Sequence, residues 1–578
     1  MCWPCNLVRR GRHPNVPAST IRNFFTAVAS RAPISLSLRP SPPTTSMSPT
    51  FPAGKSRIVP GRYPPPGTDP YADAIRERRG ERGLTPLDGN LLHVPAIAGG
   101  YNSLLGAIRT KGKLPGDIRE AMILRIAAIN HAAFEWIHHE PIGRKDGLTT
   151  GQLYIIRDIE TPLPASPTLL NALQTVAIAY TDHSTRDIHI PTDIVDEFKK
   201  QLRNWALSTT PTLSAEEADA KADDLYVEAA IVVAGYNMVS RFLLGTDVAG
   251  LSDMEVPWPV ERKEHLIELP SFPPAATPTH TIHVVTLITS PSAPWIVFAN
   301  SLLTDWTMWS YVIPYFLDYS SGAGTYNLLL HSQRGHGRST IPEVVDGQTR
   351  ATTIPLLATD IANLLEKLSI PTPVTSVIGV SQGGAATLAF GAMYPDKTRS
   401  IIACDTSART PAGNKEAWEQ RIRLVLGPDS PENIGDYARK VGLGALADAT
   451  VPRWFPPGSS CNLPGSKQAE WVKRMIERTD VAGFIAGARA LGDYDTLVLG
   501  DGLFQSPVGL GILLAGTLDG DGKVGEGLQD LSGQWAAAST KARQYLSVDN
   551  SGHLPMIDSP DKFFHWISLS LHYLSSSQ

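Results

Sequence analysis

The chain has 578 residues, more than one ordinary hydrophobic core accommodates, and this length predicts two domains plus tails. Hydrophobic residues make up 42% and charged residues 19%, as in a soluble globular protein, and the net charge of -5 argues against nucleic-acid binding. No apolar run approaches the roughly 20 residues that cross a bilayer, so we expect no membrane span. Four cysteines are too few for a disulfide framework and favour a reducing compartment.

Residues 1–54 have the composition of a leader segment, because they are rich in Arg, Ser and Pro and the first acidic residue of the chain is Asp69. This composition is typical of a mitochondrial transit peptide, with Ile21 and Phe24 on the apolar face of a helix. The alternative is a disordered tail ahead of a true start at Met47. We therefore expect a cytoplasmic protein, or a mitochondrial one if the leader is a transit peptide.

From residue 55 to 258 the apolar residues recur at helical spacing, which predicts an all-α domain. Pro115, at a first-turn position, opens a helix in which Ile118, Met122 and Ile126 repeat on one side. Further helices are predicted over residues 169–180, 194–205 and 215–244.

Three titratable residues of this domain are candidates for acid–base chemistry. Glu135 and His139 stand four residues apart, so on a helix their side chains lie on one face and can share a proton. If Glu120 from the preceding helix faces them, two carboxylates and an imidazole form one cluster. The alternative is an ordinary exposed Glu/His pair. A metal site is not expected, because HHE at 138–140 does not make HExxH and no distant ligand pair is evident.

Four blocks of this domain stand out: REAMIL at 119–124, FEWIHH at 134–139, GLT at 147–149 and YNMVSR at 236–241. Together they resemble the carboxymuconolactone decarboxylase and alkylhydroperoxidase D-like family. The resemblance implies that Glu120 is the acid–base carboxylate and that Glu135 and His139 form the ExxxH pair.

One departure from that family narrows the chemistry. In the peroxidase branch a CxxC precedes the histidine, whereas Ala132 and Glu135 stand at those places in this chain. Without thiols, disulfide-cycling peroxidase chemistry is excluded for this domain. What remains is decarboxylase-like proton chemistry, or a scaffold through which the chain forms a homo-oligomer.

The rest of the chain has a different pattern. Residues 259–279 hold several prolines among polar residues and are predicted to be a semi-rigid linker. Over 280–578, short apolar stretches alternate with helical ones, which predicts a largely parallel sheet covered on both faces. Between 410 and 495 the alternation stops, and we expect a helical lid there. The predicted strands are 282–287, 295–299, 326–330, 377–380, 401–404, 508–515 and 545–548.

The most informative stretch is VIGVSQGG at 377–384, an apolar run that ends in GxSxG and is followed by small residues. It predicts a strand, a sharp turn and a helix, the geometry of a nucleophile elbow with Ser381 as the nucleophile. A serine needs a histidine to take its proton and a carboxylate to orient that histidine. Asp519 and His553 each follow a predicted strand in the order Ser, Asp, His, and Asp521 is a substitute for the acid.

An acyl-transfer site also needs donors that stabilise the oxyanion. The loop NSLL at 300–303 follows a predicted strand, and the elbow supplies a second amide. The backbone N–H groups of Leu302 and Gln382 are therefore the candidate donors.

Further motifs accompany the elbow: NSLLTD at 300–305, RGHGRS at 334–339, Trp418 with Arg421, RWF at 453–455 and GH at 552–553. Together they resemble the 3-oxoadipate enol-lactonases, which are α/β-hydrolases, over nearly all of 280–578. The resemblance implies the triad Ser381, Asp519 and His553, and no cofactor. Leu303 stands where the family usually has glycine, and Ser332 where an aspartate usually precedes RGHG. The first departure predicts a narrower oxyanion loop and leaves room for a different substrate.

The two resemblances imply consecutive steps of aromatic catabolism in the β-ketoadipate pathway, since decarboxylation of a carboxymuconolactone yields the enol-lactone that the hydrolase opens. The substrate is then an anionic lactone. Its carboxylate is expected to bind lid residues Trp418, Arg421, Arg453 and Arg489, because guanidinium forks suit carboxylates. Two alternatives stay open: a hydrolase for another ester or lactone with a helical oligomerisation module, and a non-catalytic scaffold.

Overall fold

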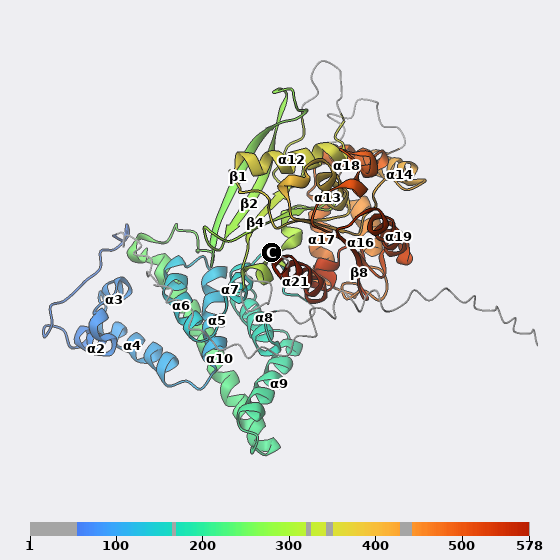
Figure 1. Cartoon of the computed structure of the whole chain (residues 1–578). Helices are drawn as coiled ribbons and strands as arrows, with labels where there is room; N and C mark the ends of the chain where they lie inside the picture. The colour runs from blue at the N-terminus through green and yellow to red at the C-terminus, as the bar shows by residue number, and fades with distance from the viewer. Residues whose placement is uncertain (1–54, 165–168, 319–324, 343–350, 428–441, 577–578) are drawn as a thin grey trace, which may run out of the picture. The chain divides into compact units, whose positions relative to one another are not determined.

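The computed structural model describes residues 55–164, 169–318, 325–342, 351–427 and 442–576. The predicted leader over residues 1–54 lies outside these ranges. Two kinds of architecture follow each other along the chain. A helical region is coloured blue to green in Figure 1, and an α/β region runs from green to red.

The helical region confirms the all-α prediction. Side-chain caps fix several helix starts: Ser214 accepts a hydrogen bond from the Glu217 amide, and Asn171 accepts one from the Gln174 amide. The helices are α2 (Pro70–Arg79), α3 (Pro86–Leu91), α4 (Pro95–Thr110), α5 (Gly116–Ile129), α6 (Ala133–Lys145), α7 (Thr150–Arg157), α8 (Ala172–Arg186), α9 (Thr192–Thr209) and α10 (Ala215–Gly245).

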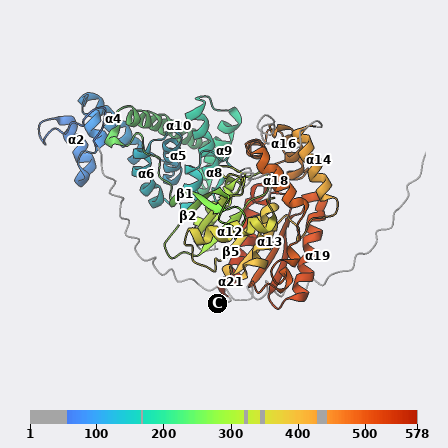
Figure 2. The same cartoon turned by 90° about the horizontal axis from the view of Figure 1, so that it is seen from above.

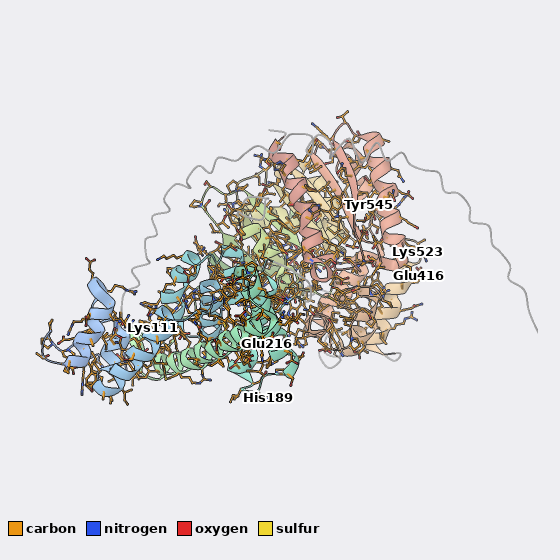
Figure 3. All side chains as sticks on the ribbon, turned by 90° about the horizontal axis from the view of Figure 1, so that it is seen from below. Lys111, His189, Glu216, Glu416, Lys523 and Tyr545 are labelled. Atoms are coloured by element: carbon orange, nitrogen blue, oxygen red, sulfur yellow. The ribbon has the colours of Figure 1, made fainter. Side chains whose placement is uncertain are left out.

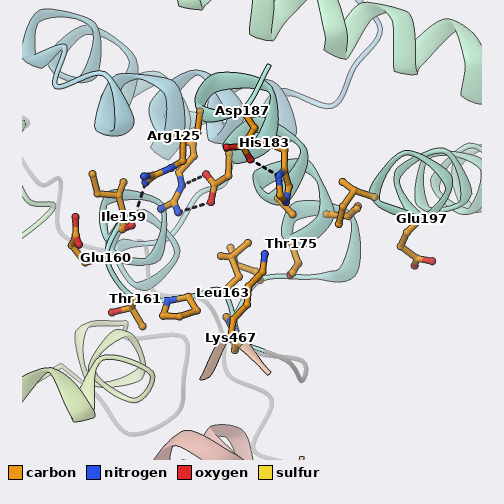
Figure 4. Close-up of a pocket in the computed structure, with 18 of the residues that line it drawn as sticks. Arg125, Ile159, Glu160, Thr161, Leu163, Thr175, His183, Asp187, Glu197 and Lys467 are labelled. Atoms are coloured by element: carbon orange, nitrogen blue, oxygen red, sulfur yellow. Dashed lines mark hydrogen bonds and ion pairs between the residues drawn. The ribbon is translucent and has the colours of Figure 1, made fainter. Parts of the chain in front are cut away.

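Helix α5 is the centre of this region, and ten of its 14 residues are buried because α6, α8 and α10 pack against it. Arg125 is one of them and keeps its charge paired (Figure 4). Its guanidinium donates to both carboxylate oxygens of Asp182, at 2.6 and 2.8 Å, and to the carbonyl of Asp158 at 2.7 Å. A buried guanidinium is tolerated only with such partners, so Arg125 ties α5 to α8 and to the end of α7.

Helix α10 has 31 residues and is, among the described residues, the one helix long and apolar enough to cross a bilayer by length and composition. Its buried face packs against α5, α8 and α9, and 44% of the apolar window is buried inside the protein. Burial of one face against other helices is what a core helix of a globular domain requires.

The α/β region is built on an eight-stranded sheet in the order β1-β2-β4-β3-β5-β6-β7-β8. Strands β1 and β2, and β2 and β4, pair antiparallel, and the other neighbours pair parallel. Nearly every residue of β3 to β7 is buried, as in strands covered on both faces. The strands are β1 (Glu261–Pro270), β2 (Thr279–Ile288), β3 (Trp295–Ala299), β4 (Asn327–Ser332), β5 (Ser376–Val380), β6 (Ser400–Cys404), β7 (Leu510–Gly516) and β8 (Ala542–Val548).

Helices cover this sheet. Helix α13 packs against β5 and β6 and against α12, as Figure 2 shows beside β5, and α19 packs against β7 and β8. The ring centroids of Phe316 on α11 and Phe564 on α21 lie 5.1 Å apart, so these two helices pack together. The predicted lid is helical in its described residues. The helices of the α/β region are α11 (Ile313–Leu317), α12 (Ile354–Lys367), α13 (Gln382–Met393), α14 (Asn414–Leu426), α16 (Gly444–Trp454), α17 (Lys467–Glu477), α18 (Val481–Gly492), α19 (Lys523–Ala538), α20 (Pro555–Asp558) and α21 (Pro560–Ser576).

The prediction of a linker over residues 259–279 is wrong for its first half. Residues 261–270 form the edge strand β1, whose whole length pairs with β2. Its charged residues, such as Lys263 and Glu264, interrupt the apolar pattern by which a strand is predicted from sequence. An edge strand exposes one side to water, and charges there are a common protection against pairing with other chains.

Candidate functional site

Ser381 stands between β5 and α13 in a strained turn, with φ 56° and ψ -117°. The glycines around it are required by packing. A Cβ on Gly379 would lie 2.2 Å from the carbonyl oxygen of Gly383, and one on Gly383 would lie 2.2 Å from that of Ala299. The strand and the helix therefore meet as a nucleophile elbow requires, with the serine at the helix N-terminus.

Asp519 and His553 come together at the ends of β7 and β8. The Nδ1 of His553 lies 2.8 Å from Oδ2 of Asp519, and the imidazole stacks on the ring of Trp454 at 5.6 Å. Ser381 and His553 both line one cavity of about 610 Å³. No direct hydrogen bond joins their side chains in the described part of the chain, and in structures without substrate such catalytic hydrogen bonds are often long or poorly aligned.

Of the two predicted oxyanion donors, Leu302 borders the same cavity and Gln382 directly follows Ser381, which also borders it. Gln382 is the first residue of α13, where helical N–H groups have no partner in their own helix. Neither the Leu302 nor the Gln382 backbone N–H donates a hydrogen bond to another described residue. The Gln382 side chain instead donates to the carbonyl of Gly487 at 2.7 Å and ties the elbow to α18. Neither amide is therefore engaged by another described residue, as the role of an oxyanion donor requires.

His336 holds the oxyanion loop. Its Nδ1–H donates to the carbonyl of Arg334 at 2.8 Å, and its Nε2 accepts from the amide of Leu303 at 3.0 Å. Burial lowers the pKa of His336 to about 4, so the neutral ring that this pattern requires persists at physiological pH. Leu303 has φ 70°, a left-handed conformation that suits the glycine expected at this place.

The predicted carboxylate-binding residues divide into two groups. Trp418, Arg421 and Arg453 line the cavity, with the Arg421 guanidinium 4.5 Å from the ring centre of Trp418. Burial, with the charge of Arg453 added, lowers the pKa of Arg421 to about 10. Arg489 does not line the cavity. Its side chain is 51% exposed and lies 3.7 Å from Glu419, so its predicted binding role is wrong.

The helical region brings its three candidate residues together, but in a different pairing from the predicted one. His139 Nδ1 lies 2.7 Å from Glu120 Oε2, across α5 and α6. Glu135 is only 2% exposed, and neither of its carboxyl oxygens has a hydrogen-bond partner. The exposed Glu/His pair is thereby excluded, and the proton-sharing partner of His139 is Glu120, because the helix crossing turns Glu120 toward the imidazole.

The pKa values of the two carboxyl groups, Glu120 and Glu135, shift in opposite directions. Burial, with the charge of Glu120 added, raises the pKa of Glu135 well above its usual value. Burial opposes ionisation of Glu120 too, but the hydrogen bond with His139 and the charges of His139 and Arg119 together lower its pKa. Burial also lowers the pKa of His139. Burial thus favours the uncharged form of Glu135, whereas the hydrogen bond with His139 and the charge of Arg119 favour the ionised form of Glu120, a separation typical of acid–base sites.

A larger cavity, of about 1020 Å³, lies beside α8 (Figure 4). Arg125 there is paired with Asp182, and His183 Nδ1 lies 2.8 Å from Asp187. Arg125 and His183 are thus each already paired with a carboxylate of the protein, and we assign no chemistry to this cavity. Among the described residues, no group of three His, Cys, Asp or Glu side chains could hold a metal ion.

Comparison with protein families gives one match in each region of the chain. Residues 296–566 match the sequence model of the alpha/beta hydrolase family, and residues 95–177 match that of the carboxymuconolactone decarboxylase family. The chain carries a domain of each family.

The curated relatives match the hydrolase domain. The 3-oxoadipate enol-lactonase 2 of Acinetobacter baylyi is 29% identical over 202 residues, which are 35% of this chain and 64% of that protein. The alignment thus spans less than two thirds of that relative. The 3-oxoadipate enol-lactonase 1 of the same organism is 24% identical over 277 residues, 48% of this chain and 88% of that protein.

Solved structures also resemble the hydrolase domain. An esterase from Thermogutta terrifontis with malate bound has 19% sequence identity and a TM-score of 0.42, covering 54% of this chain and 99% of that one. An enol-lactonase from Burkholderia xenovorans has 24% identity and a TM-score of 0.39, covering 51% and 97%.

The hydrolase domain contains residues that the sequence did not single out. Asp405 directly follows β6, is 2% exposed and lines the cavity next to Asp519. Lys523, labelled in Figure 3, begins α19 and lines the cavity as well. The signal for Asp405 was present, since it follows a buried strand just as Asp519 does. Asp521, the substitute acid, is exposed and does not line the cavity.

Proposed function

We propose that the hydrolase domain is a serine hydrolase that opens an anionic lactone of the 3-oxoadipate enol-lactone kind. The observation that carries this proposal is the 2.8 Å pair of His553 and Asp519 in one cavity with Ser381. A carboxylate that holds Nδ1–H leaves Nε2 free to take a proton from a serine.

The proposed reaction follows from these positions. His553 takes the proton of Ser381 Oγ while that oxygen attacks the lactone carbonyl, and the amides of Leu302 and Gln382 stabilise the oxyanion. The ring C–O bond then breaks, and the leaving enolate takes the proton from His553 and becomes a ketone. Water, deprotonated by His553, attacks the acyl-enzyme and releases the keto acid and the free serine.

The charge of the cavity supports an anionic substrate. Arg421 and Arg453 line it, and neither side chain has a carboxylate partner in the described ranges. Burial, and after it repulsion from the charge of Arg453, lowers the pKa of Arg421. A substrate carboxylate would relieve this repulsion and gain charge-assisted hydrogen bonds.

The test uses the purified chain and its Ser381→Ala variant on 3-oxoadipate enol-lactone and on p-nitrophenyl acetate. The variant should lose at least about three orders of magnitude in kcat on both compounds. An unchanged rate eliminates the serine mechanism. Wild-type activity on the ester alone favours the other-ester hydrolase, and activity on neither compound favours the scaffold.

A second function is supported by the helical region, where Glu120, His139 and Glu135 form an acid–base cluster. We propose that it decarboxylates a carboxymuconolactone, so that its product becomes the substrate of the hydrolase domain. Loss of carbon dioxide leaves an electron pair that spreads into the unsaturated lactone, and a carbon atom must then accept a proton. The protonated Glu135 is the proposed donor, and a proton from water, passed on by Nε2 of the imidazole whose Nδ1 is held by Glu120, restores it.

This second proposal is tested by release of carbon dioxide from carboxymuconolactone. Glu135→Gln keeps the shape of the side chain but removes its acidic proton, and it should lower the rate about a hundredfold or more. His138→Gln, on the same helix but bonded only to the Phe134 carbonyl, is the matched control and should keep most of the rate. Unchanged release in Glu135→Gln removes the proton-relay proposal.

A further inference from the structure

A small enclosed cavity of about 40 Å³ lies against the imidazole of His139. Its size suits a few water molecules or one carboxylate group. Its lining includes Arg78 and Arg79 from α2, Tyr101 and Arg109 from α4, and Tyr236 from α10.

The lining has an excess of positive charge. Arg79 is neutralised by Asp88, with nitrogen–oxygen distances of 2.7 and 2.9 Å. Arg78 donates to the neutral side chain of Asn102, and Arg109 has no carboxylate partner among the described residues. Burial, and then the charges of Arg79 and Arg109, lower the pKa of Arg78. Two guanidiniums thus remain uncompensated beside the cavity.

Two buried hydroxyl groups face the same space without partners. Tyr236 is 1% exposed and Tyr101 is partly buried, and neither hydroxyl oxygen has a hydrogen-bond partner. An unsatisfied buried donor is costly, so native structures rarely keep one unless a ligand or water completes it. Cations and free hydroxyl donors around one cavity are the groups that a carboxylate requires.

We propose that this cavity binds the carboxylate of a small organic acid, with Arg78 and Arg109 supplying charge and Tyr101 and Tyr236 supplying O–H donors. The inference deepens the proposed decarboxylase function and rests on it, since the bound acid would lie against His139. It also assigns a role to α2, which precedes the residues that match the decarboxylase family.

The test measures binding of muconolactone, an unsaturated lactone with a single carboxylate, by calorimetry in the full chain carrying Ser381→Ala. Two binding events per chain are expected, one in each domain. Arg109→Gln or Arg78→Gln should weaken one of them about tenfold or more, and Tyr236→Phe should weaken the same event. Arg421→Gln should weaken only the other event. Arg76→Gln, on α2 but paired with Asp73 at 2.8 Å, is the control and should weaken neither.

The proposal is overturned if Arg78→Gln and Arg109→Gln both leave the two binding events unchanged while the variants keep the wild-type melting temperature. Its failure is separable from that of the decarboxylase proposal. Glu135→Gln should keep the binding event and lose carbon dioxide release. If Arg109→Gln weakens muconolactone binding while Glu135→Gln leaves carbon dioxide release unchanged, the carboxylate site is supported and the proton relay is refuted.

A different observation concerns the exposed face of α10, whose start at Glu216 is labelled in Figure 3. Val227, Ile231 and Met238 are 56%, 45% and 42% exposed, and Ala234 is exposed between them. Their spacing of i, i+4, i+7 and i+11 forms one apolar stripe along the helix. A stripe of this kind on an otherwise packed helix indicates a partner surface.

The charges at the ends of the stripe identify the partner as a second copy. In an antiparallel pair of α10 helices related by a twofold axis, Val227 meets Met238 and Ile231 meets Ala234. The same register places Asp224 opposite Arg241, and both residues are exposed. We infer that the chain forms a homodimer through this self-complementary face, which gives the expected homo-oligomer a specific geometry.

The test compares molar masses by light scattering after size exclusion at several protein concentrations. The wild type should be a dimer, and Asp224→Arg or Arg241→Asp alone should weaken the dimer about tenfold or more through like-charge contacts. The double exchange should restore it. Asp223→Arg, a neighbour that pairs with Lys199 of its own chain, is the control and should leave the dimer intact. A monomeric wild type, binding to phosphatidylcholine vesicles through the stripe, or a double exchange without rescue overturns the inference.

Discussion

The carboxyl group of Asp405 faces that of Asp519, at the ends of the adjacent parallel strands β6 and β7. Asp405 Oδ1 accepts a 2.8 Å hydrogen bond from the Gly516 amide, whereas Oδ2 has no donor partner in the described part of the chain. Burial, with the charge of Asp519 added, raises the pKa of Asp405 well above its usual value. We therefore expect Asp405 to keep a proton at neutral pH and to direct it toward the carboxylate of Asp519.

Asp405→Asn should preserve this arrangement, because the amide donates to Asp519 and still accepts from Gly516. We expect kcat within a few-fold of wild type, and a loss of about tenfold or more in Asp405→Leu, which cannot donate. The native carboxyl binds more protons than the unfolded one above pH 3.8, so its burial costs stability as pH rises. Asp405→Asn should thus gain about 1–3 kcal/mol at pH 8 and little at pH 4 in urea unfolding. A less stable Asp405→Asn at pH 8 contradicts the retained proton.

The lid arginines predict a charge-dependent specificity. Arg421→Gln should raise KM for the anionic enol-lactone about tenfold or more, and leave KM for neutral p-nitrophenyl acetate within a few-fold. Arg489→Gln removes the same charge from the same lid, but outside the cavity. It should leave KM unchanged for both substrates. Equal effects of the two variants on the lactone would mean that long-range charge, rather than contact with Arg421, binds the substrate.

His336 predicts how the hydrolase domain responds to acid. Its native pKa of about 4 lies below the unfolded value of 6.5, so the unfolded chain binds more protons between these limits. The stability from the neutral ring is complete above pH 6.5 and is lost as pH falls toward 4, by up to about 3 kcal/mol. Burial gives His331 a pKa of about 4 and an effect of the same sign. Urea unfolding from pH 7 to 4 measures the loss, and His336→Gln should reduce its slope.

Much of the fold, and the placement of Ser381, Asp519 and His553 around one cavity, could be predicted from the sequence because their signals are local. Buried parallel strands give continuous apolar runs, and the elbow of Ser381 requires small residues at fixed places. Asp519 and His553 follow such strands, so their convergence at one edge of the sheet is a property of the topology. Strand β1 was missed because an edge strand that begins with four charged residues gives no long apolar run.

The remaining errors arise from packing, which single sequences do not encode. Arg421 and Arg489 are both lid arginines, and only the orientation of α14 and α18 separates the one that lines the cavity from the one in water. Glu120 rather than Glu135 pairs with His139 because of the way α5 crosses α6. Asp405 follows a buried strand, which marked it as a candidate, but only the packed structure shows that its side chain lines the cavity beside Asp519.

The backbone of Ser381 predicts a trade of stability for activity. Its φ of 56° with ψ of -117° is strained for any residue with a Cβ, at about 1–3 kcal/mol. Ser381→Gly and Ser381→Ala both remove the nucleophile, but only glycine also removes the strain. Glycine costs about 0.4–1 kcal/mol through its freer unfolded chain, so a net advantage of about 1 kcal/mol over alanine should remain in urea unfolding. Ala385→Gly on the adjacent α13 is the control and should destabilise by about 1 kcal/mol. An alanine variant as stable as the glycine variant would show that the elbow is not strained, and that the serine is held there without energetic cost.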